Sequence, residues 1–278
     1  MSKKTLIALL TAIAVLAIAV SSVGAITDGE LDGEDHPHVV LLLMEVGGEP
    51  MYRCSGTLLS PTVLLTAGHC TSNYPDEPFS GMRVFTESDV ENGANSYPYA
   101  GNNSVEAVSW AAHPGYETED PFYFHDVGIV VLAEHIELDV YGELPELDQF
   151  DGLVLPSGKS DKTKFTSVGY GQQAIFTDEA QWELASERIR MVANPFLLQL
   201  NVEGITGDYS MLLSNNHSTG GTCFGDSGGP NFLGDTNIVA GVTSFGMNQN
   251  CAGIGGVFRT DRADVLDFID DYYTPPAE

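Results

Sequence analysis

Residues 222–230 read Thr-Cys-Phe-Gly-Asp-Ser-Gly-Gly-Pro, and the interpretation of the whole chain starts from them. The stretch places one hydroxyl, that of Ser227, among glycines that carry no side chain, namely Gly225, Gly228 and Gly229. Glycines let the backbone turn tightly and let a substrate approach the main chain. A serine nucleophile needs this access, together with backbone N–H groups that face a developing oxyanion. Because Gly, Asp, Ser and Pro also form turns, the stretch alone fits a surface turn equally well.

Two upstream segments carry the other groups that an activated serine needs. Residues 63–70 read Val-Leu-Leu-Thr-Ala-Gly-His-Cys, an apolar run that ends in His69 and a cysteine. Residues 125–132 read His-Asp-Val-Gly-Ile-Val-Val-Leu, with Asp126 at the start of an apolar strand, where a carboxylate needs hydrogen-bond partners. A serine attacks a carbonyl when a histidine takes its proton, and a carboxylate fixes the tautomer of that histidine.

The chain order of His69, Asp126 and Ser227 excludes two other serine hydrolase folds. The pattern Gly-x-Ser-x-Gly around Ser227 fits the nucleophile elbow of α/β-hydrolases, but that fold has its histidine after the serine. No histidine follows Ser227. The subtilisin order has the aspartate before the histidine, which would leave Asp126 without a role.

The three segments, in this order, resemble those of the trypsin/chymotrypsin family of serine proteases, and the resemblance spans essentially the whole chain after the leader. It implies that His69 is the general base and later the acid, that Asp126 orients His69, and that Ser227 is the nucleophile. It also implies an oxyanion hole formed by the backbone N–H groups of Gly225 and Ser227.

The same resemblance implies a monomeric endopeptidase without a cofactor or a metal, with protein or peptide substrates and protease inhibitors as partners. The alternative function is a catalytically inactive, protease-like binding module. Such proteins usually have a substituted catalytic residue, and none of the three is substituted here.

The distribution of apolar residues predicts an all-β protein. Short apolar runs alternate with clusters of Gly, Asn, Asp and Pro, which is typical of many short strands joined by turns. The family resemblance implies two antiparallel six-stranded β-barrels of the chymotrypsin type with a cleft between them and a C-terminal helix. We expect the first barrel in residues 26–141, a crossover segment in 142–164 and the second barrel in 165–278. The helix is predicted over Asp261–Ile269, with Asp261 as its N-cap.

The first 25 residues have the features of a secretory signal peptide. Lys3 and Lys4 precede an uncharged run, and small residues follow it. The alternative is an uncleaved membrane anchor, since the run is close to the length that spans a bilayer. Export would make the protein extracellular or periplasmic. Cleavage after Ala25 would expose Ile26, and the family resemblance implies that its free α-amino group pairs with Asp226.

The chain is strongly acidic, with 39 Asp and Glu residues against 11 Lys and Arg residues and a formal net charge of −28. Such a surface repels nucleic acids and anionic membranes, so neither is expected as a partner. A soluble secreted enzyme fits this composition. Adaptation to salt or to acidic surroundings is the alternative, because salt screens the self-repulsion.

The four cysteines allow three disulfide pairings, and export would permit disulfides to form. They lack the paired short spacings of a zinc site. The family resemblance implies the pairs Cys54–Cys70 and Cys223–Cys251.

The family resemblance also implies where a substrate side chain would bind. Trypsins have an aspartate six residues before the nucleophile, but this chain has Gly221 there, followed by Thr222. We therefore expect a mostly apolar pocket that accepts a large apolar or aromatic residue. Phe245 replaces the tryptophan that is usual in the family, and the loop after Cys251 is shorter. The predicted substrate-binding residues are Gly221, Thr222, Ser244, Phe245, Gly246 and Gly256.

Other polar residues are predicted to have structural roles. His125 should point away from Asp126, since neighbouring strand residues face opposite sides. A metal site at His36 and His38 and a calcium site near Glu87 are weaker alternatives, because neither has a full ligand set.

Overall fold

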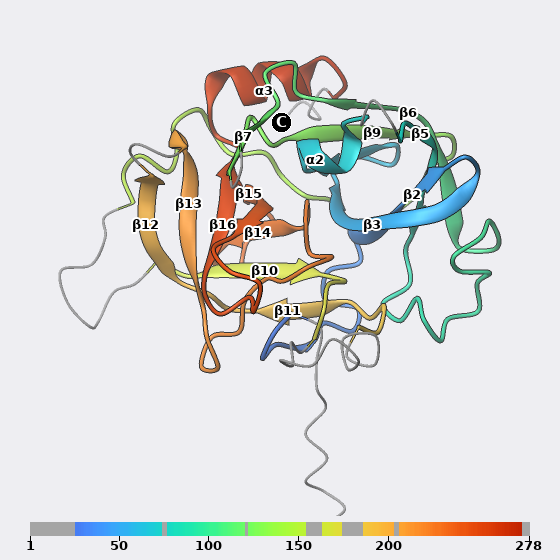
Figure 1. Ribbon diagram of the computed structural model, residues 1–278, viewed down its shortest axis with the longest axis horizontal. Coiled ribbons are helices and arrows are strands. Elements are labelled where there is room, and N and C mark those ends of the chain that lie inside the picture. The colour runs from blue at the N-terminus through green and yellow to red at the C-terminus, as the bar shows by residue number, and fades with distance from the viewer. Residues whose placement is uncertain are drawn as a thin grey trace, which may run out of the picture.

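A computed structural model describes residues 26–73, 77–119, 122–153, 163–173, 186–202 and 206–273 of the chain. The leader predicted over residues 1–25 and part of the predicted crossover lie outside these ranges. The described residues form two β-structures with a helix at one end, and this arrangement confirms the all-β prediction (Figure 1). No helix in these ranges is long and apolar enough to cross a lipid bilayer.

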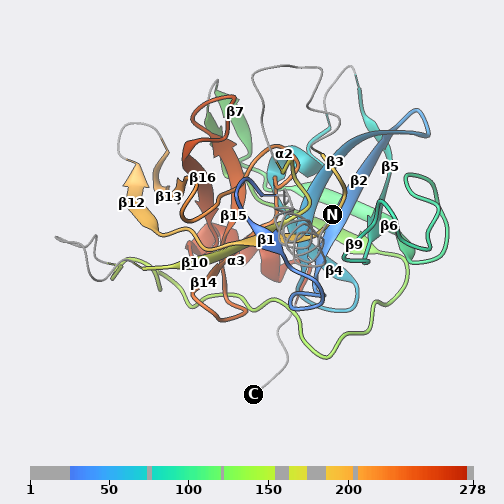
Figure 2. The same cartoon turned by 90° about the horizontal axis from the view of Figure 1, so that it is seen from below.

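The first β-structure is a closed six-stranded barrel, seen on the right of Figure 2. Alternate residues of its strands fill the interior, as Val40, Leu42 and Met44 do, because successive side chains of a strand face opposite sides. The strands follow the order β2 (Val39–Val46), β3 (Glu49–Leu58), β4 (Val63–Thr66), β9 (Gly128–Leu132), β6 (Ser104–Ala112) and β5 (Phe79–Phe85).

The second β-structure is a sheet of eight strands, where six were expected. The additional edge strand β1 comes from the N-terminal segment, which we expected in the first barrel. Leu31 of β1 pairs with Met191, and the buried carboxylate of Asp32 just beyond it pairs with Arg190, so this contact holds the N-terminal segment beside the second sheet. The strand order is β1 (Glu30–Leu31), β11 (Met191–Ala193), β10 (Phe165–Gly169), β14 (Pro230–Leu233), β15 (Val239–Gly246), β16 (Gly253–Arg259), β13 (Gly207–Asn215) and β12 (Leu197–Val202).

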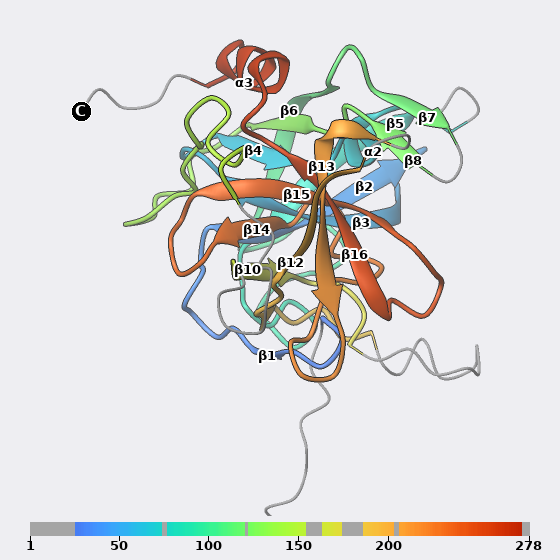
Figure 3. The same ribbon diagram turned by 90° about the vertical axis from the view of Figure 1, so that its left-hand side faces the viewer.

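The C-terminal helix α3 (Ala263–Asp270) lies at one end of the molecule and β1 at the other (Figure 3). Val265, Phe268 and Ile269 of the helix are buried in a core shared with both β-structures. The short helix α2 (Gly68–Thr71) follows β4, and β7 (Glu117–Glu119) pairs with β8 (Phe122–Phe124).

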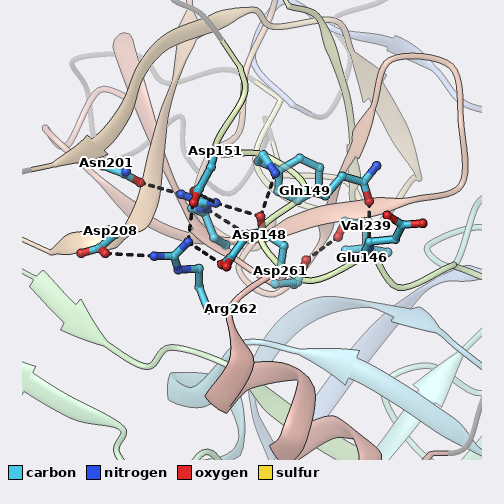
Figure 4. Close-up of polar contacts among 12 residues, drawn as sticks. Glu146, Asp148, Gln149, Asp151, Asn201, Asp208, Val239, Asp261 and Arg262 are labelled. Carbon is cyan, nitrogen blue, oxygen red and sulfur yellow. Dashed lines mark hydrogen bonds and ion pairs between the residues drawn. The ribbon is translucent and has the colours of Figure 1, made fainter.

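The prediction that Asp261 caps α3 is wrong, because the N-cap residue is Arg262 and no side chain caps the helix. The carboxylate of Asp261 instead accepts two hydrogen bonds from the guanidinium of Arg259, at 2.9 and 2.8 Å, and one from the N–H of Phe150 at 2.9 Å. Figure 4 shows this network, in which Arg262 also reaches Asp148 and Asp208. The network holds the start of the crossover segment against the second sheet.

Arg190 joins the two β-structures from a fully buried position. Its guanidinium donates to the carboxylate of Asp32 at 2.8 Å and to the carbonyl oxygens of Gly33 at 2.7 Å and Val39 at 3.0 Å. It also donates to the hydroxyl of Tyr170 at 3.1 Å. A buried charge is tolerated when its donors are paired in this way. The start of the first barrel is thereby attached to residues of the second sheet.

Two disulfides, Cys54–Cys70 and Cys223–Cys251, have the pairing that the family resemblance implies. The first joins strand β3 to helix α2. The second joins the glycine-rich loop of Ser227 to the loop that follows β15. Each therefore ties a segment of the candidate site to a neighbouring strand or loop.

His38 makes the stability of this fold depend on pH. The residue is 1% exposed, and its ring packs edge-on against Phe232. Neither ring nitrogen has a hydrogen-bond partner in the described part of the chain. Burial, followed by the charges of His36 and Arg190, lowers the pKa of His38 to about 4. The unfolded chain takes up the proton at a pH of about 6.5. The contribution of the neutral His38 ring to the stability of the fold is therefore complete above about pH 6.5 and is lost as the pH falls from there to about 4.

Between about pH 7 and pH 4, we expect the unfolding free energy of the unmodified chain to fall further than that of His38→Phe, by roughly 1–3 kcal/mol. The reason is that phenylalanine binds no proton in the folded or the unfolded state. Urea unfolding at a series of pH values measures the difference. His135→Gln is the matched control, since the side chain of His135 is 69% exposed. The same pH dependence in His38→Phe and in the unmodified chain would contradict this role.

Candidate active site

His69 is placed by the short helix that follows strand β4. The strand ends at Thr66, and Gly68 begins the helix directly before His69. A Cβ atom on Gly68 would lie 2.8 Å from the ring of Tyr116, so the close packing at this point requires glycine. The imidazole is partly exposed and lines two adjoining cavities, which Ser227 also lines.

Asp126 is fully buried directly before strand β9, and its carboxylate contacts both β-structures. It accepts hydrogen bonds from the backbone N–H of His69 at 2.9 Å and from the hydroxyl of Ser244 at 2.5 Å, and it lies 3.0 Å from His69 Nδ1. Ser244 belongs to β15 of the second sheet. With Nδ1–H directed at this carboxylate, Nε2 of His69 becomes the proton acceptor of the ring.

His125 points away from Asp126, as expected. Its backbone has φ of +48°, a left-handed conformation, and its Nε2 lies 3.0 Å from the carboxylate of Asp264 in α3. The ring stacks on that of His113, with 4.8 Å between centroids. His125 therefore connects the segment before Asp126 to the C-terminal helix.

The loop of Ser227 depends on glycine at two positions. Gly225 has φ of +99° and Gly228 has φ of +76°, which favour glycine. A Cβ atom on Gly228 would lie 2.0 Å from Oγ1 of Thr66, so the loop packs directly against the end of β4. The carbonyl of Ser227 accepts a hydrogen bond from the N–H of Ser55 at 2.8 Å. These contacts bring the loop of the second sheet against the first barrel, next to His69.

The backbone N–H groups of Gly225 and Ser227 flank the buried Asp226 in the loop of the candidate nucleophile. Among the residues that the structure describes, neither group donates a hydrogen bond, whereas the N–H of the neighbouring Gly228 donates to the carbonyl of Thr243 at 2.8 Å. Two such unused donors beside a serine hydroxyl are what an oxyanion requires.

Asp226 lies fully buried between Gly225 and Ser227 in the chain. Its carboxylate accepts hydrogen bonds from the N–H groups of Gly171 at 2.7 Å and Cys223 at 2.8 Å. Burial raises the pKa of Asp226 to about 7, although these two N–H groups and the charge of Arg53 act in the opposite direction. The buried carboxylate therefore lacks a cation at contact distance among the described residues.

The predicted partner of Asp226, Ile26, is also fully buried. The next residue, Thr27, pairs with Gly221, which lies five residues before Asp226. No described hydrogen bond or ion pair joins Ile26 to Asp226. The N-terminal segment thus runs along the same loop.

The larger cavity beside Ser227 has a volume of about 570 Å³. Among the described residues, none with a carboxylate, amine or guanidinium lines it, and His69 is its one ionisable side chain. The lining residues are His69, Thr222, Cys223, Phe224, Ser227, Thr243, Ser244, Phe245, Gly246, Met247, Asn248, Gln249, Cys251 and Ile254. Four of the predicted substrate-binding residues are in this set: Thr222, Ser244, Phe245 and Gly246.

Gly256 is not among the residues that line this cavity. A Cβ atom on Gly256 would lie 2.4 Å from the ring of Phe245, so this glycine accommodates the ring. The preceding residue, Gly255, pairs with Gly246 across the ladder, and its Cβ would lie 3.0 Å from Oγ1 of Thr222. The side chains that line the cavity at this point are therefore those of Phe245 and Thr222, which fill the space beside Gly256 and Gly255.

Gly221 is also absent from the lining. A Cβ atom there would lie 2.2 Å from the side chain of Asn215. Asn215 therefore fills the space that a side chain at position 221 would need. The amide of Asn215 donates to the carbonyl of Thr222 at 2.8 Å and accepts from the hydroxyl of Thr27 at 3.0 Å. Sequence reasoning missed Asn215, because only long-range contacts place it beside this loop.

Sequence reasoning also missed the apolar rim of the cavity. Phe224 and Met247 line its mouth, and each is 47% exposed. Both lie next to motif residues, so their positions in the sequence were the available signal. Large exposed apolar side chains at a cavity mouth favour contact with apolar groups of a ligand.

Two of the candidate metal-binding residues, His36 and Glu87, are engaged by protein partners. Among the described residues, the one group of potential ligand atoms close enough to hold a metal ion is His69 with two cysteines, and these cysteines form the first disulfide. Nδ1 of His36 lies 2.5 Å from the carboxylate of Asp32, and Glu87 accepts hydrogen bonds from two asparagine amides.

Comparisons with known proteins agree with this geometry. The chain is 24% identical over 269 residues to the Serine protease Hayan of Drosophila melanogaster, and the match covers 90% of this chain but 39% of that protein, so the chain spans about two fifths of its length. It is 25% identical over 217 residues to Chymotrypsin-like elastase family member 1 of Macaca fascicularis, covering 77% and 76% of the two chains. The solved structure of HL collagenase has the same fold, with a TM-score of 0.66 at 21% identity over 88% of this chain and 97% of that chain. The family model described as Trypsin matches residues 29–269, and the chain therefore belongs to the trypsin family.

Proposed function

We propose that this protein is a secreted serine endopeptidase that uses Ser227, His69 and Asp126 as its catalytic triad. The observation that carries the proposal is the buried carboxylate of Asp126, which lies 3.0 Å from Nδ1 of His69 while Nε2 of that ring is left as the proton acceptor. His69 and Ser227 line the same cavity, which supports the remaining contact of the triad, between the hydroxyl of Ser227 and Nε2 of His69.

The proposed reaction starts when Ser227 Oγ attacks the carbonyl carbon of a peptide bond and Nε2 of His69 takes the hydroxyl proton. Asp126 holds the other ring nitrogen and stabilises the imidazolium. The N–H groups of Gly225 and Ser227 donate to the oxyanion of the tetrahedral intermediate. His69 then protonates the leaving amine, and an acyl-enzyme on Ser227 remains. Water, deprotonated by His69, hydrolyses this ester in the second half of the reaction.

The substrate would bind along strand β15. Strand β14 pairs with β15 as far as Val242, so Ser244, Phe245 and Gly246 keep one edge available for an added peptide strand. The residue before the cleaved bond would enter the cavity of about 570 Å³. Its uncharged lining supports a preference for a large apolar or aromatic residue there.

We expect the secreted protein to be labelled by a fluorophosphonate, and Ser227→Ala to abolish labelling, because the probe reacts with an activated serine hydroxyl. His69→Ala and Asp126→Asn should lower kcat/KM by at least about 1000-fold. Ser218→Ala, in an exposed turn before the loop, is the control and should retain labelling. A folded, secreted chain that takes up no probe and cleaves no peptide would favour the inactive binding module.

The cavity predicts selectivity at the residue before the cleaved bond. Peptides with Phe, Leu or Met at this position should have kcat/KM at least about tenfold higher than matched peptides with Arg or Lys, since none of the described residues that line the cavity offers a carboxylate to a cation. A panel of internally quenched peptides that differ at this residue alone measures the ratios. Faster cleavage after Arg than after Phe would contradict the assignment of the cavity.

We also propose that removal of residues 1–25 completes the active loop. The freed α-ammonium group of Ile26 would supply the cation that the buried Asp226 lacks, and so offset the burial that raises the pKa of Asp226 to about 7. The burial of Ile26 and the pairing of Thr27 beside the loop support this step.

A preparation that begins at Ile26 should be at least about tenfold more active than one that keeps a single extra residue before it, because the extra residue blocks the ion pair. Activity of the first preparation should fall as the pH rises through the pKa of the amine, which is about 8 or higher when paired. Active-site titration normalises the two preparations. Equal activity would contradict the role of Ile26.

A further inference from the structure

A second groove adjoins Ser227 on the side of the first barrel, whereas the large cavity, apart from His69, is lined by the second sheet and its loops. It has a volume of about 380 Å³ and is lined by His69 and Ser227 together with Met44, Tyr52, Arg53, Cys54, Glu77 and Phe79. Arg53 also lines a neighbouring cavity of about 410 Å³, which contains Arg188 and Tyr97. Arg53 therefore lies between the groove of Ser227 and a cavity that holds a second arginine.

Arg53 differs from the other five arginines of the chain. Each of those lies within 4.0 Å of a carboxylate in the described part of the molecule. Arg53 has no such partner there, although the chain contains 39 acidic residues. Its Nη2 donates to the hydroxyl of Ser186 at 2.5 Å, and its buried Nε has no hydrogen-bond partner among the residues that the structure describes.

The guanidinium of Arg53 is held close to the reacting serine. A Cβ atom on Gly225, two residues before Ser227, would lie 3.3 Å from Nε of Arg53, so the side chain packs against the loop that carries the nucleophile. A partly desolvated cation without an anion is unfavourable, and burial accordingly lowers the pKa of Arg53. The planar guanidinium matches a carboxylate, to which it can donate two parallel hydrogen bonds.

The direction of the peptide follows from the proposed function, on which this inference rests. If the residue before the cleaved bond enters the large cavity, the residues after it must leave along the second groove, on the side of the first barrel. We propose that Arg53 binds the carboxylate side chain of an aspartate or glutamate at the first or second position after the cleaved bond. The protein would then prefer an apolar residue before this bond and an acidic residue after it.

Two other charged residues line these grooves, and each has a partner of its own. Glu77 is exposed, and its carboxylate accepts a hydrogen bond from the hydroxyl of Tyr52 at 2.6 Å. Arg188 lies 3.8 Å from the exposed carboxylate of Glu91. The net charge of −28 repels acidic peptides at long range, but salt at about 0.15 M screens charges beyond roughly 8 Å and leaves a contact pair largely intact.

The test uses internally quenched peptides with Phe before the cleaved bond and Asp, Asn or Lys at each of the next two positions, at about 0.15 M salt. We expect the unmodified enzyme to have a kcat/KM for Asp at least about tenfold that for Asn at one of these positions. Arg53→Gln should bring this ratio close to one, and Arg53→Lys should retain part of it. Lys164→Gln removes an exposed cation elsewhere and should leave the ratio unchanged.

Because the ratio compares two peptides on one preparation, it does not depend on the fraction of each variant that folds. The unmodified enzyme could cleave the Asn peptide but have a kcat/KM for Asp no higher than that for Asn. This result would overturn the role of Arg53 and leave the proposed function standing. A ratio that persists in Arg53→Gln would also overturn it. A chain that cleaves none of the peptides and takes up no fluorophosphonate would overturn the proposed function itself.

Discussion

The carboxylate of Asp126 sets the requirement that both β-structures meet at the candidate site. A fully buried carboxylate must receive hydrogen bonds from the protein, because water cannot reach it. Its donors come from helix α2 beside the first barrel, through His69, and from strand β15 of the second sheet, through Ser244. Separation of the two β-structures would remove at least one donor and leave a buried charge short of partners, which is strongly unfavourable. The cleft is therefore a consequence of satisfying this one group as well as of covering the apolar cores.

The few arginines of this acidic chain show the same principle elsewhere. Arg190 and Arg259 are fully buried and pair with Asp32 and Asp261, so they hold the N-terminal segment and the crossover segment against the second sheet. Two of the few cations are buried in these neutral pairs, so the net negative charge of the molecule is carried by its surface. This distribution separates the roles of charge: buried pairs connect segments, and exposed acids favour solubility. Arg53 departs from the pattern, since it lies beside the nucleophile without a carboxylate of its own among the described residues.

The cavity beside Ser227 depends on side chains that fill the space left by glycines. Asn215 occupies the space beside Gly221, where trypsins have an aspartate, and the ring of Phe245 occupies the space beside Gly256. Neither contact can be predicted from the glycine-rich motifs. A glycine indicates that another group packs closely against the backbone, but it does not identify that group. An aspartate introduced at position 221 would collide with Asn215. A change of selectivity towards basic residues would thus require both positions to change.

The sequence by itself determined the all-β class, the family and the local motifs around His69, Asp126 and Ser227, because strand periodicity and short motifs are properties of neighbouring residues. It also suggested both disulfides, through the family resemblance. The tertiary structure alone decided that β1 joins the second sheet, that Asp261 binds Arg259 instead of capping α3, and that the ring of Phe245 fills the space beside Gly256. It likewise decided that Arg53 faces the groove of Ser227. These features depend on contacts between segments far apart in the chain and on which face of a strand a residue occupies, and a shift of one residue reverses that face.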